Sequence, residues 1–499
     1  MSALDHDESW QRLDPRMLLV HPIREVGRFL PVLVGIFIAG NAAGGDGTPW
    51  ELLGVLVPVA LGLLRYLTTS FRIAAGRIEL RRGLLNRHVL STPLDRVRTV
   101  DLTASLVQRV LGLTTVRIGT GTASTDDDDR LDLDGLPTDR ARALREELLH
   151  ATPEAREEAA APENARVLLR FDPMWARFAP FTAAGLLLGL GVLGAAFQLL
   201  VTLGGGTDEL QTGSLLDDGV SLGWWIGLLA LSLAGLATVA ALAVVGYLVG
   251  NWGFTLIHTR TDNSWHLRRG LLTTRETSLD ADRLSGVALS EPIGLRAVGG
   301  AHLSAIVTGL DRQQQGSSTL VPSAPVGVVA GAARDVLGAP GPVDTGLTGH
   351  GPRARLRRYT RALAGACVVA AAALLLVVRA EAPASLLVLV VLAPLLGAVL
   401  AEDRARSLGH ALVDGYVVAR SGSLERRREM LAAEDVIGWN YRATFFQRRA
   451  GLTSLVATTA GGRQSVTVLD VPEGAGVRLA DAAVPGLVSQ FLEEPTLVG

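Results

Sequence analysis

Long apolar stretches alternate along the chain with segments in which hydrophobic and polar residues exchange every second position. Each apolar run approaches the roughly 20 residues that an α-helix needs to cross a bilayer core. The runs cover about residues 29–43, 50–67, 178–203, 222–250, 362–378 and 384–401. Between them, segments such as Arg77-Ile78-Glu79-Leu80-Arg81 alternate with period two, which is typical of half-buried antiparallel strands. The pattern therefore predicts transmembrane hairpins that alternate with β-rich domains.

A repeated spacing relates the β-rich segments to one another. Measured from Gly83, Gly270 and Gly422, a branched aliphatic residue follows after 14 positions, an arginine after 26 and a second glycine after 29. These positions are held by Val97, Leu284 and Val436, by Arg109, Arg296 and Arg448, and by Gly112, Gly299 and Gly451. The anchors lie 187 and then 152 residues apart, too far for a solenoid. We therefore predict three domain-sized units with other segments inserted between them.

Each unit is predicted to be an α+β domain, because short strands are followed by one closing helix. In the first unit, Ala141, Leu144 and Leu148 have helical spacing, with Thr138 or Asp139 as the N-cap. The predicted division is a juxtamembrane segment (1–28), hairpin 1 (29–67), unit 1 (69–150), a linker (151–177), hairpin 2 (178–250), unit 2 (251–338), a linker (339–361), hairpin 3 (362–401) and unit 3 (408–492). Closing helices are expected near 326–337 and at 477–492, the latter interrupted at Pro485.

The charged residues predict which side of the membrane each segment occupies. The loops inside the first two hairpins, 44–49 and 204–219, contain acidic residues and no arginine, whereas the flanking segments are rich in arginine. Because basic residues favour the cytoplasmic side, we expect six spans with both termini and all three units in the cytoplasm. The turn of the third hairpin, 379–383, has one arginine and one glutamate, so its orientation depends on the five arginines between 353 and 361.

Composition supports an integral membrane protein. Hydrophobic residues make up 48% of the chain, and charged residues 19%, below the globular average of about 25%. The single cysteine, Cys367, excludes a disulfide framework and a thiolate metal site. The first eight residues are acidic where a signal peptide would be basic, so no cleaved leader is expected.

The usual enzyme motifs are missing from the sequence. It has no GxxxxGK[ST], HExxH, GxSxG or CxxC, and its nine histidines are scattered, with only His258 and His266 close enough to straddle a hairpin. We therefore expect no catalytic residues, no cofactor, no metal site and no nucleic-acid partner. The run 126–129 of four aspartates suggests calcium, but it lacks the alternating spacing of an EF-hand loop, so a solvated hairpin tip is favoured. The isolated Asn41, Gln198 and Cys367 do not form an ion pathway.

The first unit resembles the bacterial membrane-flanked PH-like domain of the YdbS and YdbT family. The resemblance is carried by Thr68-Thr69-Ser70-Phe71-Arg72-Ile73, Arg82-Gly83-Leu84-Leu85, Pro93-Leu94-Asp95-Arg96-Val97 and Gln108-Arg109-Val110-Leu111-Gly112-Leu113. The second unit keeps Arg269-Gly270-Leu271-Leu272, and the third departs most, with Gly422-Ser423-Leu424. The resemblance implies two near-orthogonal antiparallel sheets capped by a C-terminal helix and a location in a bacterial plasma membrane. It implies no reaction.

Arginines are the candidate contacts to lipid phosphate, since a guanidinium can hold two phosphate oxygens. The candidates are Arg109, Arg296 and Arg448 at the repeated position, and Arg353, Arg355, Arg357 and Arg358 before the fifth apolar run. For the repeated arginine we favour a structural role, pairing with a local acid or carbonyl; the cluster also serves as a topogenic signal. The six glycines at the repeated positions are expected to support turns with positive φ or close backbone approach. They are Gly83, Gly112, Gly270, Gly299, Gly422 and Gly451.

The leading functional hypothesis is a non-enzymatic, polytopic membrane protein that displays three cytoplasmic PH-like modules. The modules would serve protein interaction or membrane organisation, with envelope stress or resistance to membrane-active compounds as possible contexts. Its partners would be the lipid bilayer and a protein, which could be a second copy of the chain. The alternative is binding of phospholipid headgroups or lipid handling at the inner leaflet. A secondary transporter is held at low weight, because the spans lack paired polar groups.

Overall fold

The computed structural model describes the β-rich segments and four of the apolar runs. The described residues are 10–12, 14–17, 20, 69–74, 77–82, 88–93, 99–119, 131–149, 165–203, 222–260, 263–307, 319–380, 382–459 and 465–488. Hairpin 1, Gly83 and the aspartate run 126–129 lie outside these residues. The chain divides into two compact units of contacts. The first contains Met1–Arg170, Gly250–Arg283 and Gly309–Ser317, and the second Phe171–Val249, Leu284–Thr308 and Ser318–Gly499.

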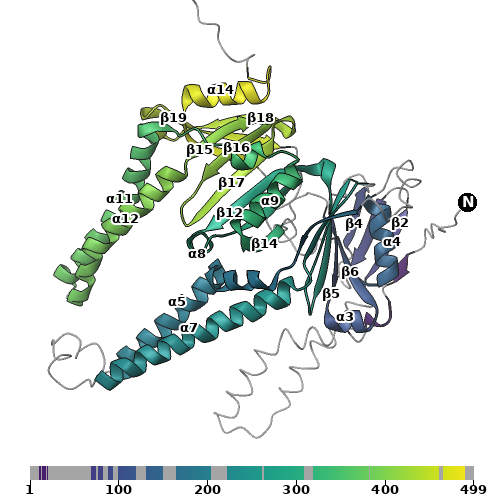
Figure 1. The fold of residues 1–499 in the computed structure, drawn as a ribbon, viewed down its shortest axis with the longest axis horizontal. Helices are drawn as coiled ribbons and strands as arrows, with labels where there is room; N and C mark the ends of the chain where they lie inside the picture. The colour runs from purple at the N-terminus through teal and green to yellow at the C-terminus, as the bar shows by residue number, and fades with distance from the viewer. Residues whose placement is uncertain are drawn as a thin grey trace, which may run out of the picture. The chain divides into compact units, whose positions relative to one another are not determined.

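The first compact unit contains two antiparallel sheets (Figure 1). The four-stranded sheet has the order β1 (Gln11–Arg12), β2 (Ser70–Ala74), β3 (Arg77–Arg82) and β4 (His88–Pro93). The seven-stranded sheet has the order β7 (Leu131–Pro137), β6 (Leu113–Gly119), β5 (Thr99–Ala104), β11 (Thr274–Asp280), β10 (Ser264–Arg269), β9 (Thr255–Thr259) and β8 (Ala165–Arg170). Helix α4 (Thr138–Leu149) closes the core, where Ala141 and Leu144 pack with Ile78, Val100 and Val116.

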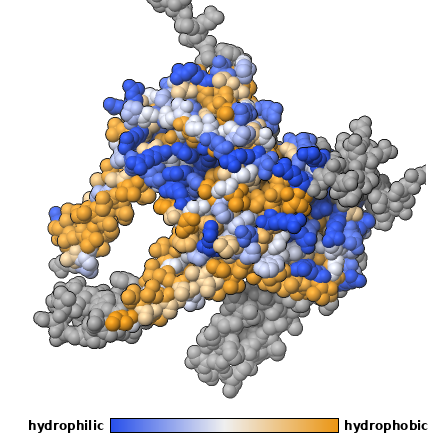
Figure 2. All heavy atoms as spheres, in the orientation of Figure 1, coloured by the Kyte–Doolittle hydropathy of each residue, from blue (hydrophilic) through white to orange (hydrophobic). Residues whose placement is uncertain are grey.

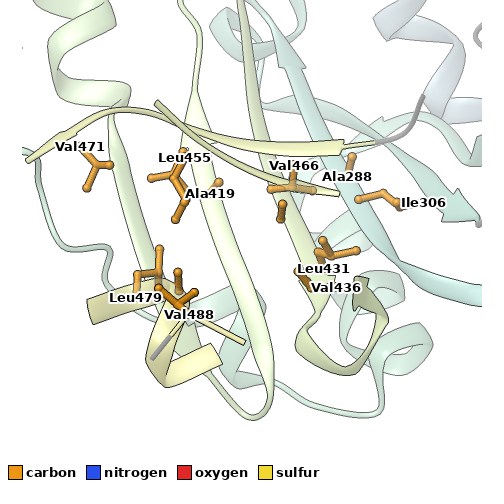
Figure 3. Packing of buried hydrophobic residues seen from close by; sticks show 13 residues of the cluster. Ala288, Ile306, Ala419, Leu431, Val436, Leu455, Val466, Val471, Leu479 and Val488 are labelled. Carbon is orange, nitrogen blue, oxygen red and sulfur yellow. The ribbon is translucent and has the colours of Figure 1, made fainter. Parts of the chain in front are cut away.

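The second compact unit also contains two antiparallel sheets. The six-stranded sheet has the order β14 (Thr319–Pro325), β13 (Gly300–Val307), β12 (Leu284–Pro292), β17 (Glu425–Ala432), β16 (Tyr416–Ser421) and β15 (Gly409–Val413). The three-stranded sheet consists of β18 (Val436–Arg442), β19 (Leu452–Thr459) and β20 (Ser465–Pro472). Their shared core brings Leu431 of β17 and Leu455 of β19 together with Leu479 of α14 (Glu473–Ala483) (Figure 3).

The sheets combine strands from neighbouring predicted units, whereas each unit was expected to form its own sheets. Each predicted unit has an N-terminal meander of three strands (β2–β4, β9–β11 and β15–β17) and a C-terminal meander of three strands (β5–β7, β12–β14 and β18–β20). The C-terminal meander of one unit joins the N-terminal meander of the next, through β5 with β11 and through β12 with β17. The sheets therefore cross the predicted domain boundaries, because these pairings satisfy backbone groups that would otherwise lie at open sheet edges.

The element positions recur at the spacing seen in the sequence. A five-residue helix begins 23 positions after each anchor glycine, as α3 (Leu106–Val110), α8 (Ile293–Ala297) and α13 (Phe445–Arg449). The glycines 29 positions after the anchor, Gly112, Gly299 and Gly451, have φ of 70°, 73° and 63°. Only glycine adopts this left-handed conformation without a steric penalty, so the repeated glycines end the short helix before the next strand.

Within the described residues, three helices are long and apolar enough to cross a membrane. They are Leu229–Asn251 within α7 (Leu222–Asn251), α11 (Gly351–Arg379) and Ala384–Ser407, which joins η9 (Ala384–Leu387) to α12 (Val388–Ser407). The most apolar 18-residue windows of these helices have mean hydropathies of 2.2, 2.3 and 2.7, and at most 11% of each window is buried. The apolar stretches of these helices are coloured mostly as hydrophobic in Figure 2. This apolar exposure indicates a membrane protein.

The third apolar run is bent rather than straight. The 3₁₀ helix η5 (Pro173–Phe181) meets α5 (Ala183–Leu203) at 51°, and the two form a fourth candidate span only if the bent pair counts as one. Pro180 lies inside η5, and Thr182 caps its end in an extended conformation. A proline and a non-helical residue interrupt the backbone ladder, which explains the bend.

The predicted linkers contain regular structure. The linker predicted at 151–177 includes β8, which pairs with β9, and most of η5. The linker predicted at 339–361 includes α10 (Gly341–Asp344) and the first turns of α11. The closing helix α9 (Val326–Leu337) coincides with its prediction. Helix α14 begins at Glu473, before the predicted start at 477, and ends at Ala483, close to the interruption predicted at Pro485; residues 489–492 lie outside the described residues. The composition of both linkers resembles that of a loop, but β8 and the first turns of α11 form regular structure because they contact other elements.

Candidate anion-binding site at the start of a membrane helix

An arginine-rich cleft of about 450 Å³ lies in the second compact unit. Three of its arginines, Arg357, Arg358 and Arg361, project from the first turns of α11, and Arg442 ends β18. The floor is formed by β19 and β20, including Asp470. The cleft therefore lies where the polar start of a candidate membrane helix meets a β-sheet.

Packing of the first turn of α11 holds these arginines against the sheet. Pro352 stands near the helix start, where its missing N–H is not required. Ala354 is 1% exposed and packs with Leu408 and with Leu452, the first residue of β19. This small apolar contact positions the following turn, with Arg357 and Arg358, next to β20.

Asp470 is the centre of the charge network in the cleft. Its side chain is 1% exposed, and its carboxylate oxygens lie 2.6 Å from Arg357 Nη1 and 2.7 Å from Arg358 Nη2. Gln447 Nε2 also donates to Asp470 Oδ1 at 2.7 Å. Asp470 has φ of 53°, an unusual conformation for a residue other than glycine. A strained, buried carboxylate held by two arginines indicates that this contact fixes α11 to the sheet.

A capping box places Gln447 beside Asp470. Thr444 caps α13, because its hydroxyl accepts from the Gln447 backbone N–H and the Gln447 side chain accepts from the Thr444 backbone N–H. Gln447 Nε2 then donates to both Ser454 and Asp470. The same box, made by Ser105 and Gln108, caps α3. The local sequence T-x-x-Q therefore orients one wall of the cleft.

Positive charge exceeds negative charge inside the cleft. Asp470 offsets one of its two arginine partners, while Arg361 and Arg442 are exposed and contact no carboxylate within the described part of the chain. Four guanidinium groups around one carboxylate repel one another, and a bound anion would relieve that repulsion. Guanidinium groups are well suited to phosphate oxygens. The arrangement can therefore bind an anionic group at the membrane surface.

Two buried histidines lie behind the cleft. His410 Nδ1 and His350 Nε2 are 3.0 Å apart, and His350 Nδ1 lies 2.8 Å from the Leu469 carbonyl oxygen. Desolvation by burial, with the neighbouring His410, lowers the pKa of His350 to about 4. Burial also lowers the pKa of His410. Both imidazoles are therefore neutral near pH 7 and form part of the packing between the start of α11 and β20.

A second cleft of about 420 Å³ lies in the first compact unit. It is lined by Arg109, Arg268 and Arg269 with Trp252 and neighbouring backbone. Arg109 Nη1 donates to the Leu271 carbonyl oxygen at 2.8 Å. This arginine therefore makes the backbone contact expected from a structural role.

The other arginines predicted to contact lipid phosphate either pair with acidic side chains or lie exposed outside both clefts. Arg296 Nη2 pairs with Asp403 Oδ2 at 2.9 Å. Arg355 pairs with Glu402 of α12 at 2.8 Å, so it joins the two helices of hairpin 3. Arg353 and Arg448 are exposed and do not line either cleft. Of the predicted basic cluster between Arg353 and Arg361, the structure places Arg357, Arg358 and Arg361 in the arginine-rich cleft.

Sequence reasoning missed Asp470, Arg442 and Gln447. Gln447 had a readable signal, because Thr444 and Gln447 have capping-box spacing. Asp470 and Arg442 lie 113 and 85 positions from Arg357, on other elements, and no local pattern connects them. Their assembly depends on the pairing of β18, β19 and β20.

The two histidines predicted to straddle a hairpin lie on neighbouring strands. His258 and His266 lie on the adjacent strands β9 and β10, opposite Trp265 and Ile257 respectively. They straddle a hairpin but point to opposite faces, since neighbouring strand positions alternate. Among the described residues, no group of three or more histidine, cysteine, aspartate or glutamate side chains could hold a metal ion.

Two regions of the chain, residues 23–152 and 364–482, match the family model described as Bacterial PH domain. The chain is a PH-like domain protein. Each match covers one predicted hairpin, with both of its apolar runs, and the strands and closing helix that follow it. Comparison with curated proteins and comparison with solved structures each found no match. PH-like domains built on antiparallel sheets and apolar helices together fit a membrane-associated interaction module.

Proposed function

We propose that the chain is a non-enzymatic, multi-pass protein of the bacterial plasma membrane that presents three PH-like modules in the cytoplasm for protein interaction or membrane organisation. The observation that supports it most is structural continuity between membrane helix and sheet. α11 passes from its polar first turns, tied to β20 through Asp470, into an apolar stretch long enough to cross a bilayer. A module attached in this way is held at the membrane surface.

The recurrence of elements supports three modules. A short helix begins at the same distance from Gly83, Gly270 and Gly422, and each is followed by a strand after a left-handed glycine. With two predicted spans before each module, every module is returned to the arginine-rich side of the membrane. This arrangement implies six spans and cytoplasmic termini.

Reporter fusions test the proposed topology. Fusions at Asp46 and Asp217 should report an external location, and a fusion at Gly346 an internal one. A reversal at any of these positions would contradict the proposed orientation. Cross-linking in native membranes with mass spectrometry then tests the interaction role. Repeated failure to recover either a protein partner or a second copy would remove it.

The arginine cleft supports a second function, which is binding of an anionic phosphate group. Arg361 and Arg442 have no acidic partner among the described residues. Arg361 lies in the first turns of α11, at the edge of its apolar stretch, and Arg442, at the end of β18, lines the same cleft. A phospholipid headgroup and a free phosphate share the chemistry that these guanidinium groups recognise. A lipid is favoured as the source because the cleft adjoins the predicted bilayer surface, where anionic lipids concentrate.

Thermal stability of the purified full chain in detergent tests this second function. A ligand that binds only the folded protein raises the unfolding temperature by mass action. Phosphatidylglycerol should stabilise the wild-type protein more than phosphatidylcholine does, and inorganic phosphate should show whether the acyl chains are needed. Arg361→Ala with Arg442→Ala should remove the difference between the lipids. Arg448→Ala, an exposed arginine of the same module outside the cleft, is the matched control, and equal loss in that variant would contradict a specific site.

A further inference from the structure

The same strand pairing occurs twice inside the chain with the same register. In the first case Leu102 of β5 lies opposite Glu276 of β11, respectively 19 residues after Gly83 and 6 after Gly270. In the second, Leu289 of β12 lies opposite Arg428 of β17, again 19 residues after one anchor and 6 after the next. The first strand of a C-terminal meander therefore pairs with the last strand of the following N-terminal meander in one defined way.

Two strands are equivalent to the strands of this pairing but lack the corresponding partner strand within the described residues. β4 is the last strand of the first N-terminal meander, and β18 is the first strand of the last C-terminal meander. Within the described residues β4 is paired only with β3, and β18 only with β19. Both therefore lie at sheet edges whose backbone groups are available for another strand.

Both edges expose apolar side chains that a further strand could cover. Val89 of β4 is 51% exposed, and Ile437 and Tyr441 of β18 are 61% and 39% exposed. β18 has a register irregularity between Val436 and Gly438, and bulges often turn an edge away from new partners. β12 has the corresponding irregularity between Leu284 and Gly286 and still pairs with β17. The irregularity therefore does not prevent this pairing.

We propose that β18 of one copy of the protein pairs antiparallel with β4 of a second copy, with Tyr441 opposite Val89. The register follows from the two internal pairings, because Tyr441 lies 19 residues after Gly422 and Val89 lies 6 after Gly83. The strand equivalence rests on the proposed three-module organisation. Pairing between different edges is heterologous, so it produces closed rings or open chains of copies rather than a two-fold dimer.

Backbone hydrogen bonds supply the attraction, and exposed side chains supply the contact. β4 has six residues, matching the six residue pairs of β5 with β11. Val89 and Tyr441 would cover each other's exposed apolar surface as a cross-strand pair. Copies in the same membrane are confined to two dimensions, which raises their effective concentration. A second copy is thus the partner whose edge matches in strand direction, register and exposed side chains.

Cysteine cross-linking of the full chain in membranes tests the pairing. In a Cys367→Ala background, one tagged copy carries Val89→Cys and a second, differently tagged copy carries Tyr441→Cys. A short bismaleimide should join the two tags only when both variants are expressed together. A single chain carrying both cysteines should give a ladder of dimers, trimers and larger species. Cross-linking of Val89→Cys with itself, an internal link alone, or no link would overturn the proposal.

Register and edge variants provide matched controls. Replacing Tyr441→Cys by Asn440→Cys moves the thiol one position and to the opposite face, so the product with Val89→Cys should be lost. In the doubly labelled chain, Ile437→Lys should remove the ladder, because an exposed charge protects a strand edge. Leu424→Lys adds the same charge at an exposed position outside both edges and should keep the ladder. A ladder that survives Ile437→Lys but disappears in Leu424→Lys would contradict edge pairing.

The outcomes for self-pairing and for the proposed function can be separated. If mass spectrometry finds Val89→Cys linked to a different protein in place of a second copy, self-pairing is wrong and the interaction role stands. If the reporter fusions place the modules outside, the cytoplasmic function is wrong, whereas a ladder between copies would still support the pairing.

Discussion

The two regions that match the bacterial PH-domain model, here called the first and third modules, each receive the segment that precedes their predicted hairpin at the same strand position but with opposite chemistry. In the first module Met17 packs over Gly135, two residues before Pro137. In the third, Arg357 and Arg358 contact Asp470, two residues before Pro472. Gly135 and Asp470 both have positive φ, at 78° and 53°, and both lie at a register irregularity with the preceding strand.

This difference separates the structural role of the position from its chemical role. A bulged residue with positive φ provides the close approach in both modules, so the backbone explains why the segment docks there. At this position the third module has the buried carboxylate of Asp470, in a cleft lined by Arg357, Arg358, Arg361 and Arg442, where the first module has Gly135. The arginine-rich cleft is therefore an addition to a shared docking geometry, so the proposed anion binding is expected in the third module rather than the first.

The strongest test of the comparison removes the carboxylate. Asp470→Asn should destabilise the third module by about 3–5 kcal/mol, because two largely buried arginines lose their counter-charge. Hydrogen exchange of β20 and limited proteolysis of the full chain in detergent would measure the loss. The triple variant Asp470→Gly, Arg357→Met and Arg358→Met replaces this contact between α11 and β20 with an apolar one, as in the first module. It should recover most of the stability that Asp470→Asn loses. An unchanged Asp470→Asn protein would contradict a structural role for the ion pairs.

A pH titration tests the histidines behind the same contact. Because the pKa of folded His350 is about 4 and that of an unfolded histidine is about 6.5, the unfolded chain binds more protons between these values. The histidine contribution is therefore complete above pH 6.5 and is lost as the pH falls toward 4, by roughly 3 kcal/mol. Exchange of β20 amides should accelerate over this window in the wild-type protein. The acceleration should be smaller in His350→Gln, and an identical profile in that variant would contradict the assignment.

The first module can be tested at its glycine. Gly135→Ala should cost roughly 1–3 kcal/mol, because the added Cβ has positive φ and collides with the Met17 side chain. Gly253→Ala is the control, since it has φ of 65° and open space around its Cβ, so it measures the backbone cost alone. Adding Met17→Ala should relieve part of the Gly135→Ala loss in thermal unfolding. Equal losses for the two glycine variants would show that Met17 contact is unimportant.

The smallest stability effect is expected at the mouth of the arginine cleft. Arg442→Ala should change the free energy of unfolding by about 0.5 kcal/mol or less, because its side chain is exposed and has no acidic partner among the described residues. Stabilisation by phosphatidylglycerol should nevertheless decrease. The equivalent lipid comparison on Arg140→Ala, an exposed arginine in the first module, should show no decrease. A decrease in both variants would mean that general surface charge, not the cleft, attracts the lipid.

Local sequence patterns were informative where a short segment determines its own conformation. The glycine spacing marked the left-handed residues Gly112, Gly299 and Gly451, and apolar periodicity marked α4. The apolar runs identified α7, α11 and α12, because crossing a membrane requires a continuous hydrophobic length. The bend before α5 and the strand β8 were missed, since both depend on neighbouring elements.

The sequence by itself therefore determined the spacing of the strands and turns, the apolar helices and the arginine-rich side of each helix, because each depends on residues close in the chain. Only the tertiary structure decided that β5 joins β11 and β12 joins β17, since strand alternation does not specify which edge a strand meets. Tertiary structure also placed Asp470 under Arg357 and Arg358. A charge network between distant segments forms only after folding brings them together.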